Sequence, residues 1–402
     1  MPTLIRRLCL STILLSLALV STTLMAAESI NPKNIEAREP YLNCRIKFER
    51  ERKGHVAFMG GSITEMNGYR PMVCDDLKKR FPQTEFTFTD AGISSTCSTT
   101  GAFRLKSDVL SKGPVDLFFV EFAVNDDQDA GHARRECIRG LEGIIRQCRT
   151  HNPQMDIVVT FFVNEGMLSQ LQTGKTPLSM GAHSEVAQHY GVSTIHLARE
   201  VAERITAGRL TWKVYGGVHP APAGNRICAD MIEQMLSDAW SKQLSADAKP
   251  LTFELPKPLD AGNYGHGRFV SVKDAAIRNG WTVGIPDWQK LPGSKRPRFT
   301  SLEMLTADDV GAECSLKFKG QSLGVFVVAG PDAGIISVSI DGGAFEPRDL
   351  YHNYSGGLHY PRTVMLATDL ADGEHTAVLR ISDTKNAKSS GHAARIMQFG
   401  VN

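Results

Sequence analysis

The chain has 402 residues, of which 42% are apolar and 22% are charged, with 45 basic and 43 acidic side chains. This composition is ordinary for a globular protein, and the length is enough for two or three domains with their own cores. The near balance of charge gives no basis for nucleic-acid binding or for electrostatic attachment to a membrane.

The first 27 residues have the pattern of a secretory signal peptide. Arg6 and Arg7 precede the uncharged stretch LCLSTILLSLALVSTTLMAA, which ends in small residues before Glu28. We expect cleavage near Ala26 or Ala27, a secreted or periplasmic protein, and no stable membrane insertion afterwards. An uncleaved anchor is the alternative, because about twenty apolar residues can span a bilayer. Cleavage would remove two of the 45 basic residues and leave 43 basic and 43 acidic ones.

Eight cysteines become seven after this cleavage, so an odd number remains. Cys137 and Cys148 lie on one predicted helix about 16 Å apart, too far to form a disulfide. No CxxC motif or Cys/His cluster has the spacing of metal ligands. We therefore expect buried, small apolar cysteines, and we predict no metal and no cofactor.

Residues 55–243 alternate short apolar runs with amphipathic helical patterns. Near-continuous apolar strands separated by helices are typical of a parallel sheet covered on both faces. We therefore predict a three-layer α/β/α domain over residues 28–245, with its ligand site at the carboxyl ends of the strands. The expected strands are 55–60, 85–92, 115–124, 156–163 and 192–198.

The pattern changes after a predicted linker at residues 246–265. Runs such as SLGVFVVAG, IISVSIDGG and HTAVLRISD alternate with a period of two and are separated by Gly, Asp and Asn turns. Short strands with such turns predict an antiparallel β-sandwich over residues 266–402.

Four polar or glycine positions follow the strands of the first domain in order. Ser62 follows Gly60-Gly61 after the first strand, Gly92 ends the second, Asn125 follows the third, and His219 precedes a proline and the last helix. This arrangement resembles the SGNH (GDSL-type) hydrolase superfamily over roughly residues 55–242, and within it the two-domain carbohydrate esterases. The resemblance implies a flavodoxin-like parallel sheet and a jelly-roll-like sandwich. In those esterases the sandwich precedes the hydrolase domain, whereas in this sequence it follows.

The resemblance also implies a role for each of these residues. Ser62 would be the nucleophile, and His219 would be the base that its hydroxyl requires. The backbone N–H groups of Ser62 and Gly92, with the Asn125 amide, would form the oxyanion hole of an acyl-transfer enzyme. Taken singly, each has a structural explanation: a helix cap for the serine, a turn for the glycine and a turn for the asparagine.

The sequence departs from the family pattern at two positions. Gly61 replaces the usual Asp before the serine, and Gly216 stands where an Asp usually orients the histidine. In serine proteases the loss of that Asp costs roughly 10⁴ in rate. A backbone carbonyl near Gly216 could orient His219, as in Ser-His dyads, or Asp126 or Asp127 could replace the missing carboxylate. The third explanation is a catalytically inactive protein.

Glu121 is a carboxylate within an apolar run, where burial is costly without a partner. If residues 121, 123 and 125 continue a strand, Glu121 points to the same side as Asn125. Arg70 and Arg104 are its candidate partners. An ion pair is the structural interpretation, and positioning of the substrate or of His219 is the functional one.

An exported Ser-His hydrolase with a sandwich domain is most simply explained as an O-acetylesterase acting on an acylated polysaccharide. A lipase or lysophospholipase is the alternative enzyme, and a degenerate hydrolase that only binds glycans is the alternative without catalysis. Trp281, Trp288 and the segment 351–362 could stack on sugar rings or lie in a core.

Overall fold

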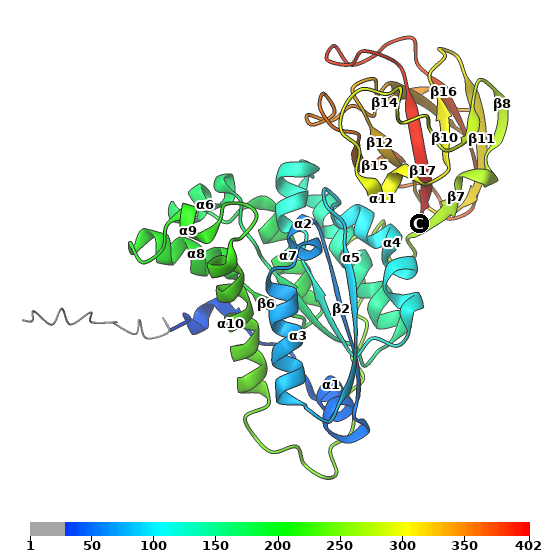
Figure 1. The fold of residues 1–402 in the computed structure, drawn as a ribbon. Coiled ribbons are helices and arrows are strands. Elements are labelled where there is room, and N and C mark those ends of the chain that lie inside the picture. Colours follow the sequence, from blue (N-terminus) through cyan, green and yellow to red (C-terminus); the bar gives the residue numbers. More distant parts are fainter. Residues whose placement is uncertain (1–28) are drawn as a thin grey trace, which may run out of the picture.

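The computed structural model describes residues 29–402, so the predicted signal peptide lies outside the described residues. The described chain forms an α/β domain followed by an antiparallel β-rich domain (Figure 1). This arrangement confirms the fold class predicted from the sequence. Among residues 29–402, no helix is both long enough and apolar enough to cross a bilayer.

The sheet of the first domain has the order β1-β6-β5-β4-β2-β3. Strands β2 to β6 are parallel, and β1 pairs antiparallel with β6 at one edge. The order of the parallel strands is that of flavodoxin-like folds, whose ligands bind where the strand order reverses, here between β2 and β4. The bounds are β1 (Ile35–Glu36), β2 (Lys53–Gly60), β3 (Glu85–Gly92), β4 (Leu117–Val120), β5 (Asp156–Thr160) and β6 (Ser193–Ile195).

Helices cover both faces of this sheet. Helices α3, α8 and α10 pack together on one face, where Figure 1 shows α3 beside α10, and α4, α5 and α7 pack together on the other. The long helices are α3 (Tyr69–Arg80), α4 (Ser98–Asp108), α5 (Arg134–His151), α6 (Glu165–Gln172), α7 (Leu178–His189), α8 (Leu197–Thr206) and α10 (Pro222–Ala239). Shorter ones are η1 (Pro32–Asn34), α1 (Leu42–Ile46), η2 (Lys47–Glu51), α2 (Ser62–Glu65), η3 (Leu110–Lys112), η4 (Asn125–Asp129) and α9 (Trp212–Tyr215).

Strand β4 is shorter than predicted. It ends at Val120, and the chain enters a helical turn at Ala123 that continues as η4. The prediction that residues 121, 123 and 125 share one face of a strand is therefore wrong. Residues 115–124 are nearly all apolar because both strand and turn are buried, so hydrophobicity alone did not mark the end of the strand.

The second domain packs two antiparallel sheets around its own core, which includes Trp281. One sheet has the order β15-β12-β17-β10-β9, with β7 paired to β17, and the other has the order β14-β13-β16-β11-β8. The first sheet contains β7 (Arg268–Ser271), β9 (Thr282–Gly284), β10 (Met304–Ala307), β12 (Leu323–Ala329), β15 (Tyr360–Ala367) and β17 (Ala394–Val401). The second contains β8 (Ala276–Asn279), β11 (Glu313–Lys319), β13 (Ile335–Ile340), β14 (Glu346–Asp349) and β16 (Glu374–Ile381); η5 (Val272–Asp274) and α11 (Pro297–Thr300) lie in the connections.

The segment predicted as a linker is bound along the α/β domain. The guanidinium of Arg149 lies 3.5 Å from the centre of the Phe253 ring, and the Glu142 carboxylate accepts the N–H of Leu259 at 2.6 Å. Tyr264 is fully buried and packs on the ring of Phe103. The connection between the domains is therefore part of the packed structure.

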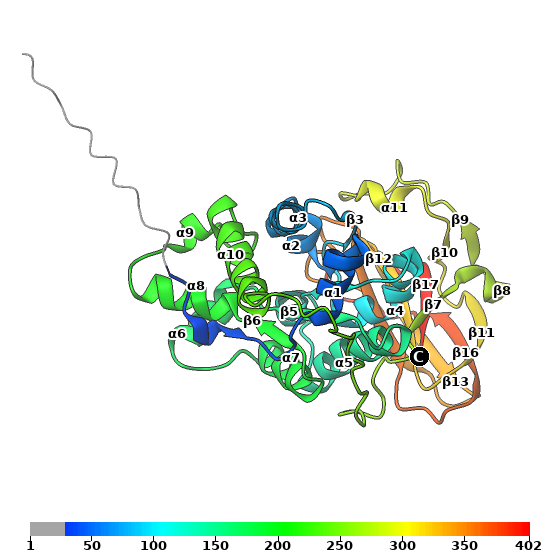
Figure 2. The ribbon, with the colours of Figure 1, turned by 90° about the horizontal axis from the view of Figure 1, so that it is seen from below.

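Ion pairs add to this contact between the domains. Arg135 and Arg139 of α5 both reach Asp260 in the connecting segment and Asp369 in the second domain. The Arg135–Asp369 contact measures 2.9 Å. Figure 2 shows the second domain lying beside α4 and α5. One helix thus holds both the connection and the sandwich.

The seven cysteines of the described chain are all buried and form no disulfide: Cys44, Cys74, Cys97, Cys137, Cys148, Cys228 and Cys314. The expectation that they behave as small buried side chains is confirmed. Cys137 and Cys148 lie on α5, as predicted.

The close packing of α5 on the connecting segment can be tested with Gly143→Ala. A Cβ on Gly143 would lie 2.6 Å from the carbonyl carbon of Tyr264, so the backbone must move. We expect the free energy of unfolding to fall by about 1–3 kcal/mol. Gly181→Ala on α7 is the matched control, since its Cβ would come no closer than 3.5 Å to Thr176, and it should be neutral or stabilising by up to about 1 kcal/mol. Urea unfolding measures the free energy of unfolding of both variants. An equal change in the two would contradict the close packing of Gly143 on Tyr264.

Candidate active site

Ser62 stands at the turn between β2 and α2. The strand ends at Gly60, Gly61 turns the chain, and Ser62 is the first residue of the helix. Gly61 is the N-cap of this helix, and the Oγ of Ser62 lies 2.8 Å from Nε2 of His219. This contact joins residues 157 positions apart and suits proton transfer from the hydroxyl to the imidazole.

His219 follows a turn formed by two glycines. Gly216 and Gly217 have φ values of +109° and +78°, and the turn is closed by a hydrogen bond of 2.8 Å from the Ala221 N–H to the Tyr215 carbonyl. A Cβ on Gly216 would lie 2.0 Å from the nitrogen of Ala221. An aspartate therefore does not fit position 216 while this turn keeps its shape.

Asn225 connects the turn before His219 to the start of α3, which follows the Ser62 segment. Its amide nitrogen donates to the Pro220 carbonyl at 2.6 Å, and its oxygen accepts the Tyr69 N–H at 2.9 Å. The sequence analysis missed this residue, because an asparagine inside a helical pattern gives no local signal for a contact with a distant segment.

The carboxylates considered as orienting groups bind other residues. Asp126 is fully buried and accepts hydrogen bonds from the backbone and hydroxyl of Ser98 and from Nε2 of His183. Asp127 accepts from the Asn164 amide at 2.8 Å. Within residues 29–402, no hydrogen bond to Nδ1 of His219 is formed by a carboxylate or by a backbone carbonyl.

The three predicted oxyanion donors lie at or beside the turn that carries Ser62, but they differ in their hydrogen-bond partners. The Ser62 N–H is at the first helical position, which has no acceptor within its helix. The Asn125 side chain lies 2.3 Å from where a Cβ on Gly61 would stand, and its amide donates one bond of 2.6 Å to Asp129. Its second amide hydrogen remains available.

The Gly92 N–H donates to the side chain of Asp90 at 2.9 Å. Asp90 also forms an ion pair of 2.7 Å with Arg70. The Gly92 N–H can serve an oxyanion only when the Asp90 carboxylate turns away, so this donor differs from the other two.

Glu121 lies directly behind the turn at Gly61 and Ser62. Its Oε1 accepts the Gly61 N–H at 3.0 Å and the Thr64 hydroxyl at 2.8 Å, and its Oε2 has no hydrogen-bond partner among the described residues. Burial raises the pKa of the Glu121 carboxyl to about 8, because the bonds from Thr64 and Gly61 offset only part of the loss of water. The side chain is thus a neutral acid at pH 7 that supports the turn carrying Ser62.

Neither arginine expected to pair with Glu121 does so, and this prediction is wrong. Arg70 pairs with Asp90, while Arg104 pairs with Asp108 and donates to the carbonyls of Ala91 and Gly60. Strand ends expose carbonyl groups, and these compete with Glu121 for the arginines.

The sandwich domain reaches the loops that surround the site. Arg296 donates to the carbonyl of Ser94 at 2.6 Å and to the hydroxyl of Ser95 at 2.7 Å. Arg298 forms an ion pair of 2.8 Å with Glu65, three residues after Ser62. Segments after β2 and β3 are therefore braced by the second domain.

The aromatic residues considered for sugar stacking are mostly engaged inside the sandwich. Trp281 is buried in its core, and Trp288 packs edge-on against His359 while its indole donates to the Thr300 carbonyl at 3.0 Å. In the segment 351–362, Tyr360 is buried and stacks on His352, and Tyr354 is 53% exposed.

Comparison with known proteins supports this description. Residues 58–227 match the model of the GDSL-like lipase/acylhydrolase family. No curated protein matches the chain by sequence. Two crystal structures of a two-domain esterase active on acetylated mannans, one of them with mannopentaose, align with TM-scores of 0.72 and identities of 20% and 19%. Each alignment covers 93% of this chain and 98% of the other.

The family match confirms the predicted resemblance and the class of carboxylic ester hydrolase. At 19–20% identity, the structural match shows a shared fold over both domains. The match spans the positions of Ser62, Gly92, Asn125 and His219, all within residues 58–227.

The shape of the histidine turn can be tested with Gly216→Asp, which restores the family's usual residue. We expect labelling of Ser62 by a fluorophosphonate probe to slow by at least about 100-fold, because the new side chain displaces Ala221 and with it His219. Gly217→Asp is the matched control: its φ of +78° imposes a similar backbone strain on an aspartate, but its Cβ would meet nothing within 4 Å, so it should lose some stability and still label much faster than Gly216→Asp. Faster labelling of Gly216→Asp would show that the turn accommodates the carboxylate.

The protonated state of Glu121 predicts a pH dependence of stability. The unfolded carboxyl loses its proton above its ordinary pKa of 4.5, whereas the folded one keeps it until a pKa of about 8. Raising the pH from 5 to 8 therefore favours the unfolded chain, by about 2–4 kcal/mol from this group. The free energy of unfolding of Glu121→Gln should lack this part of the decline between pH 5 and pH 8.

Urea unfolding at pH 5 and pH 8 measures the effect as the difference between wild type and variant. Glu374→Gln, at an exposed strand end, is the control and should follow the wild-type decline. Parallel declines for the wild type and Glu121→Gln would show that Glu121 is ionised in the folded protein.

Proposed function

We propose that this chain, whose residues 58–227 form a GDSL-like lipase/acylhydrolase domain, is an exported serine esterase that removes O-acyl groups from polysaccharides or oligosaccharides. Acetyl is the proposed acyl group. The observation that carries the proposal is the 2.8 Å contact between the Ser62 hydroxyl and Nε2 of His219 at the point where the strand order reverses.

The proposed reaction proceeds in two acyl-transfer steps. Ser62 Oγ attacks the ester carbonyl while Nε2 of His219 takes its proton. The tetrahedral intermediate collapses, the sugar oxygen leaves with the proton from His219, and an acyl-serine remains. Water, activated by His219, then releases the carboxylic acid and restores Ser62.

The oxyanion of each intermediate would be held by the Ser62 N–H and the free amide hydrogen of Asn125. The Gly92 N–H would join them once Asp90 gives way. Each such donor contributes about 10²–10³ in rate when it is fixed in advance. The backbone of α2 fixes the Ser62 N–H, and the backbone of η4 fixes the position of Asn125. The Gly92 N–H depends on the Asp90 side chain, which Arg70 also binds.

The proposed acid–base group works without a carboxylate partner. His219 is exposed, and within residues 29–402 no carboxylate forms a hydrogen bond with its Nδ1. We propose that the short turn at Gly216 and Gly217 and the bond from Asn225 to Pro220 hold the ring in place instead. Solvent would stabilise the imidazolium that forms during the reaction.

Two observations support a carbohydrate substrate. The nucleophile and the histidine lie at a surface position open to a large substrate, since Ser62 is half-buried and His219 is exposed. A protein with the same two-domain fold is an esterase active on acetylated mannans. An acetylated mannan is therefore the first substrate to test.

Acetate release by the purified mature protein tests the proposal. We expect release from acetylated mannan or xylan, little hydrolysis of long-chain nitrophenyl esters, and a loss of more than about 1,000-fold in kcat for Ser62→Ala and for His219→Ala. Ser111→Ala, at an exposed position outside the candidate site, is the matched control and should keep wild-type activity.

Other results would identify the alternatives. A preference for long-chain esters would indicate a lipase or lysophospholipase. Glycan binding without acetate release would indicate a degenerate hydrolase, and acetate release unchanged by Ser62→Ala would overturn the catalytic assignment.

A further inference from the structure

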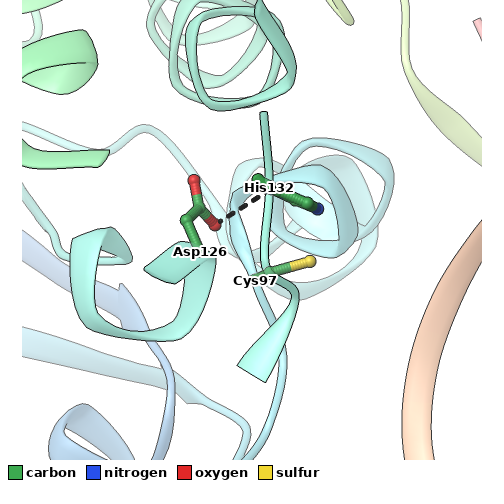
Figure 3. Close-up of side chains that lie close together, drawn as sticks. All are labelled: Cys97, Asp126 and His132. Atoms are coloured by element: carbon green, nitrogen blue, oxygen red, sulfur yellow. Dashed lines mark ion pairs between the residues drawn. The ribbon is translucent and has the colours of Figure 1, made fainter. Parts of the chain in front are cut away.

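Three side chains with different metal-binding atoms meet behind the candidate oxyanion residue. One sulfur, one carboxylate oxygen and one imidazole nitrogen, from Cys97, Asp126 and His132, all lie within 4.8 Å of one another (Figure 3). Cys97 precedes α4, Asp126 lies in η4, and His132 follows η4. Spacings of 29 and 6 residues match no common ligand motif, so the sequence analysis found no metal site here.

The geometry is close to that of a small tetrahedral centre. Zn²⁺ binds sulfur at about 2.3 Å and nitrogen or oxygen at about 2.0–2.2 Å, which places ligand atoms about 3.4–3.8 Å apart. Contraction from the 4.8 Å limit requires movements of about 1 Å or less.

The imidazole of His132 has an unused nitrogen at this position. Its Nδ1 is buried and makes no hydrogen bond with the described residues, although Asp126 Oδ1 lies 3.5 Å away. A buried polar atom without a partner is costly and often indicates a missing water or ion. A cation between the two atoms would satisfy both.

Asp126 is oriented as a ligand usually is. Its Oδ1 accepts the Ser98 N–H at 2.8 Å, and its Oδ2 accepts the Ser98 hydroxyl at 2.6 Å and Nε2 of His183 at 2.9 Å. The Oδ1 atom therefore keeps a lone pair on the side of His132. Such hydrogen bonds to a ligating carboxylate fix its direction and support metal affinity.

A cavity of about 240 Å³ adjoins the cluster and is lined by Cys97 and His132 together with two carboxylates, of Asp129 and Glu136, and one guanidinium, of Arg362. The cavity can supply a water molecule as a fourth ligand.

We propose that Cys97, Asp126 and His132 bind a divalent cation of the zinc type, with water from the adjoining cavity in the fourth position. Thiolate and imidazole ligands select Zn²⁺ and similar metals over Mg²⁺ or Ca²⁺. The ion would tie the start of α4 to the segment that carries Asn125. It would thus act as a structural clamp behind the oxyanion side, separate from the Ser62–His219 pair.

Cobalt(II) binding by the full mature protein, freed of metal with a chelator and kept reduced, tests this site. We expect one Co²⁺ per chain, with a sulfur-to-cobalt charge-transfer band and the visible bands of a tetrahedral site, both displaced by one equivalent of Zn²⁺. Cys97→Ser should abolish the sulfur band, and His132→Gln should weaken binding by more than about 100-fold. The matched control is Cys74→Ser, another buried thiol on α3, which should bind as the wild type does.

Circular dichroism establishes that each variant is folded before titration, and the wild-type spectrum tests the site without any variant. Absence of a sulfur-to-cobalt band in the wild type, or a band unchanged in Cys97→Ser, would overturn the proposal. The readout does not use esterase activity, so a negative result leaves the proposed function standing, and loss of that function leaves this test unaffected.

Discussion

The candidate site depends on the parallel register of three neighbouring strands. Gly60 at the end of β2 pairs with Gly92 at the end of β3, and Met59 pairs with Val120 at the end of β4. All three strands therefore end at one level of the sheet, and the segments that follow them start side by side. Very close approach is needed at this level, because a Cβ on Gly92 would lie 2.2 Å from the Glu65 nitrogen. Glycine at position 92 lets backbone meet backbone where a side chain would separate the loops.

The sequence predicted the parts of the site that follow directly from this geometry. Apolar strands separated by helices imply a parallel sheet, and residues at the ends of parallel strands converge, so Ser62, Gly92 and Asn125 could be grouped before the fold was known. The pairing of His219 with Ser62 followed from the family resemblance. The predicted pairing of Glu121 with an arginine failed, because backbone carbonyls compete for the arginine. Arg104 binds the carbonyls of Gly60 and Ala91, and Glu121 binds Gly61 and Thr64 instead.

The histidine turn shows a second limit of sequence reasoning. In the sequence, Gly216 occupies the position where the family pattern has an aspartate. In the fold it is a residue with φ of +109° packed against the nitrogen of Ala221, a conformation and a contact that an aspartate does not tolerate. The turn that carries His219 therefore requires glycine at position 216, and Asn225 holds the turn to Tyr69 across 156 positions. In this chain the backbone shape of the turn excludes a carboxylate at position 216.

The sandwich domain completes this arrangement from outside. Its Arg298 binds Glu65, and its Arg296 binds Ser95. The imidazole of its His352 contacts the backbone carbonyl of Asp129, and the Asp129 side-chain carboxylate binds Asn125. Ser95 has φ of +69°, a left-handed conformation that a non-glycine residue keeps only when its surroundings hold it. Exposed ion pairs contribute only about 0–1 kcal/mol each to stability, so their main consequence here is geometric. Acyl transfer is sensitive to displacements of about 1 Å, and three of these contacts fall within four residues of a predicted catalytic group. The second domain is therefore better understood as part of the frame of the site than as a separate module on a tether.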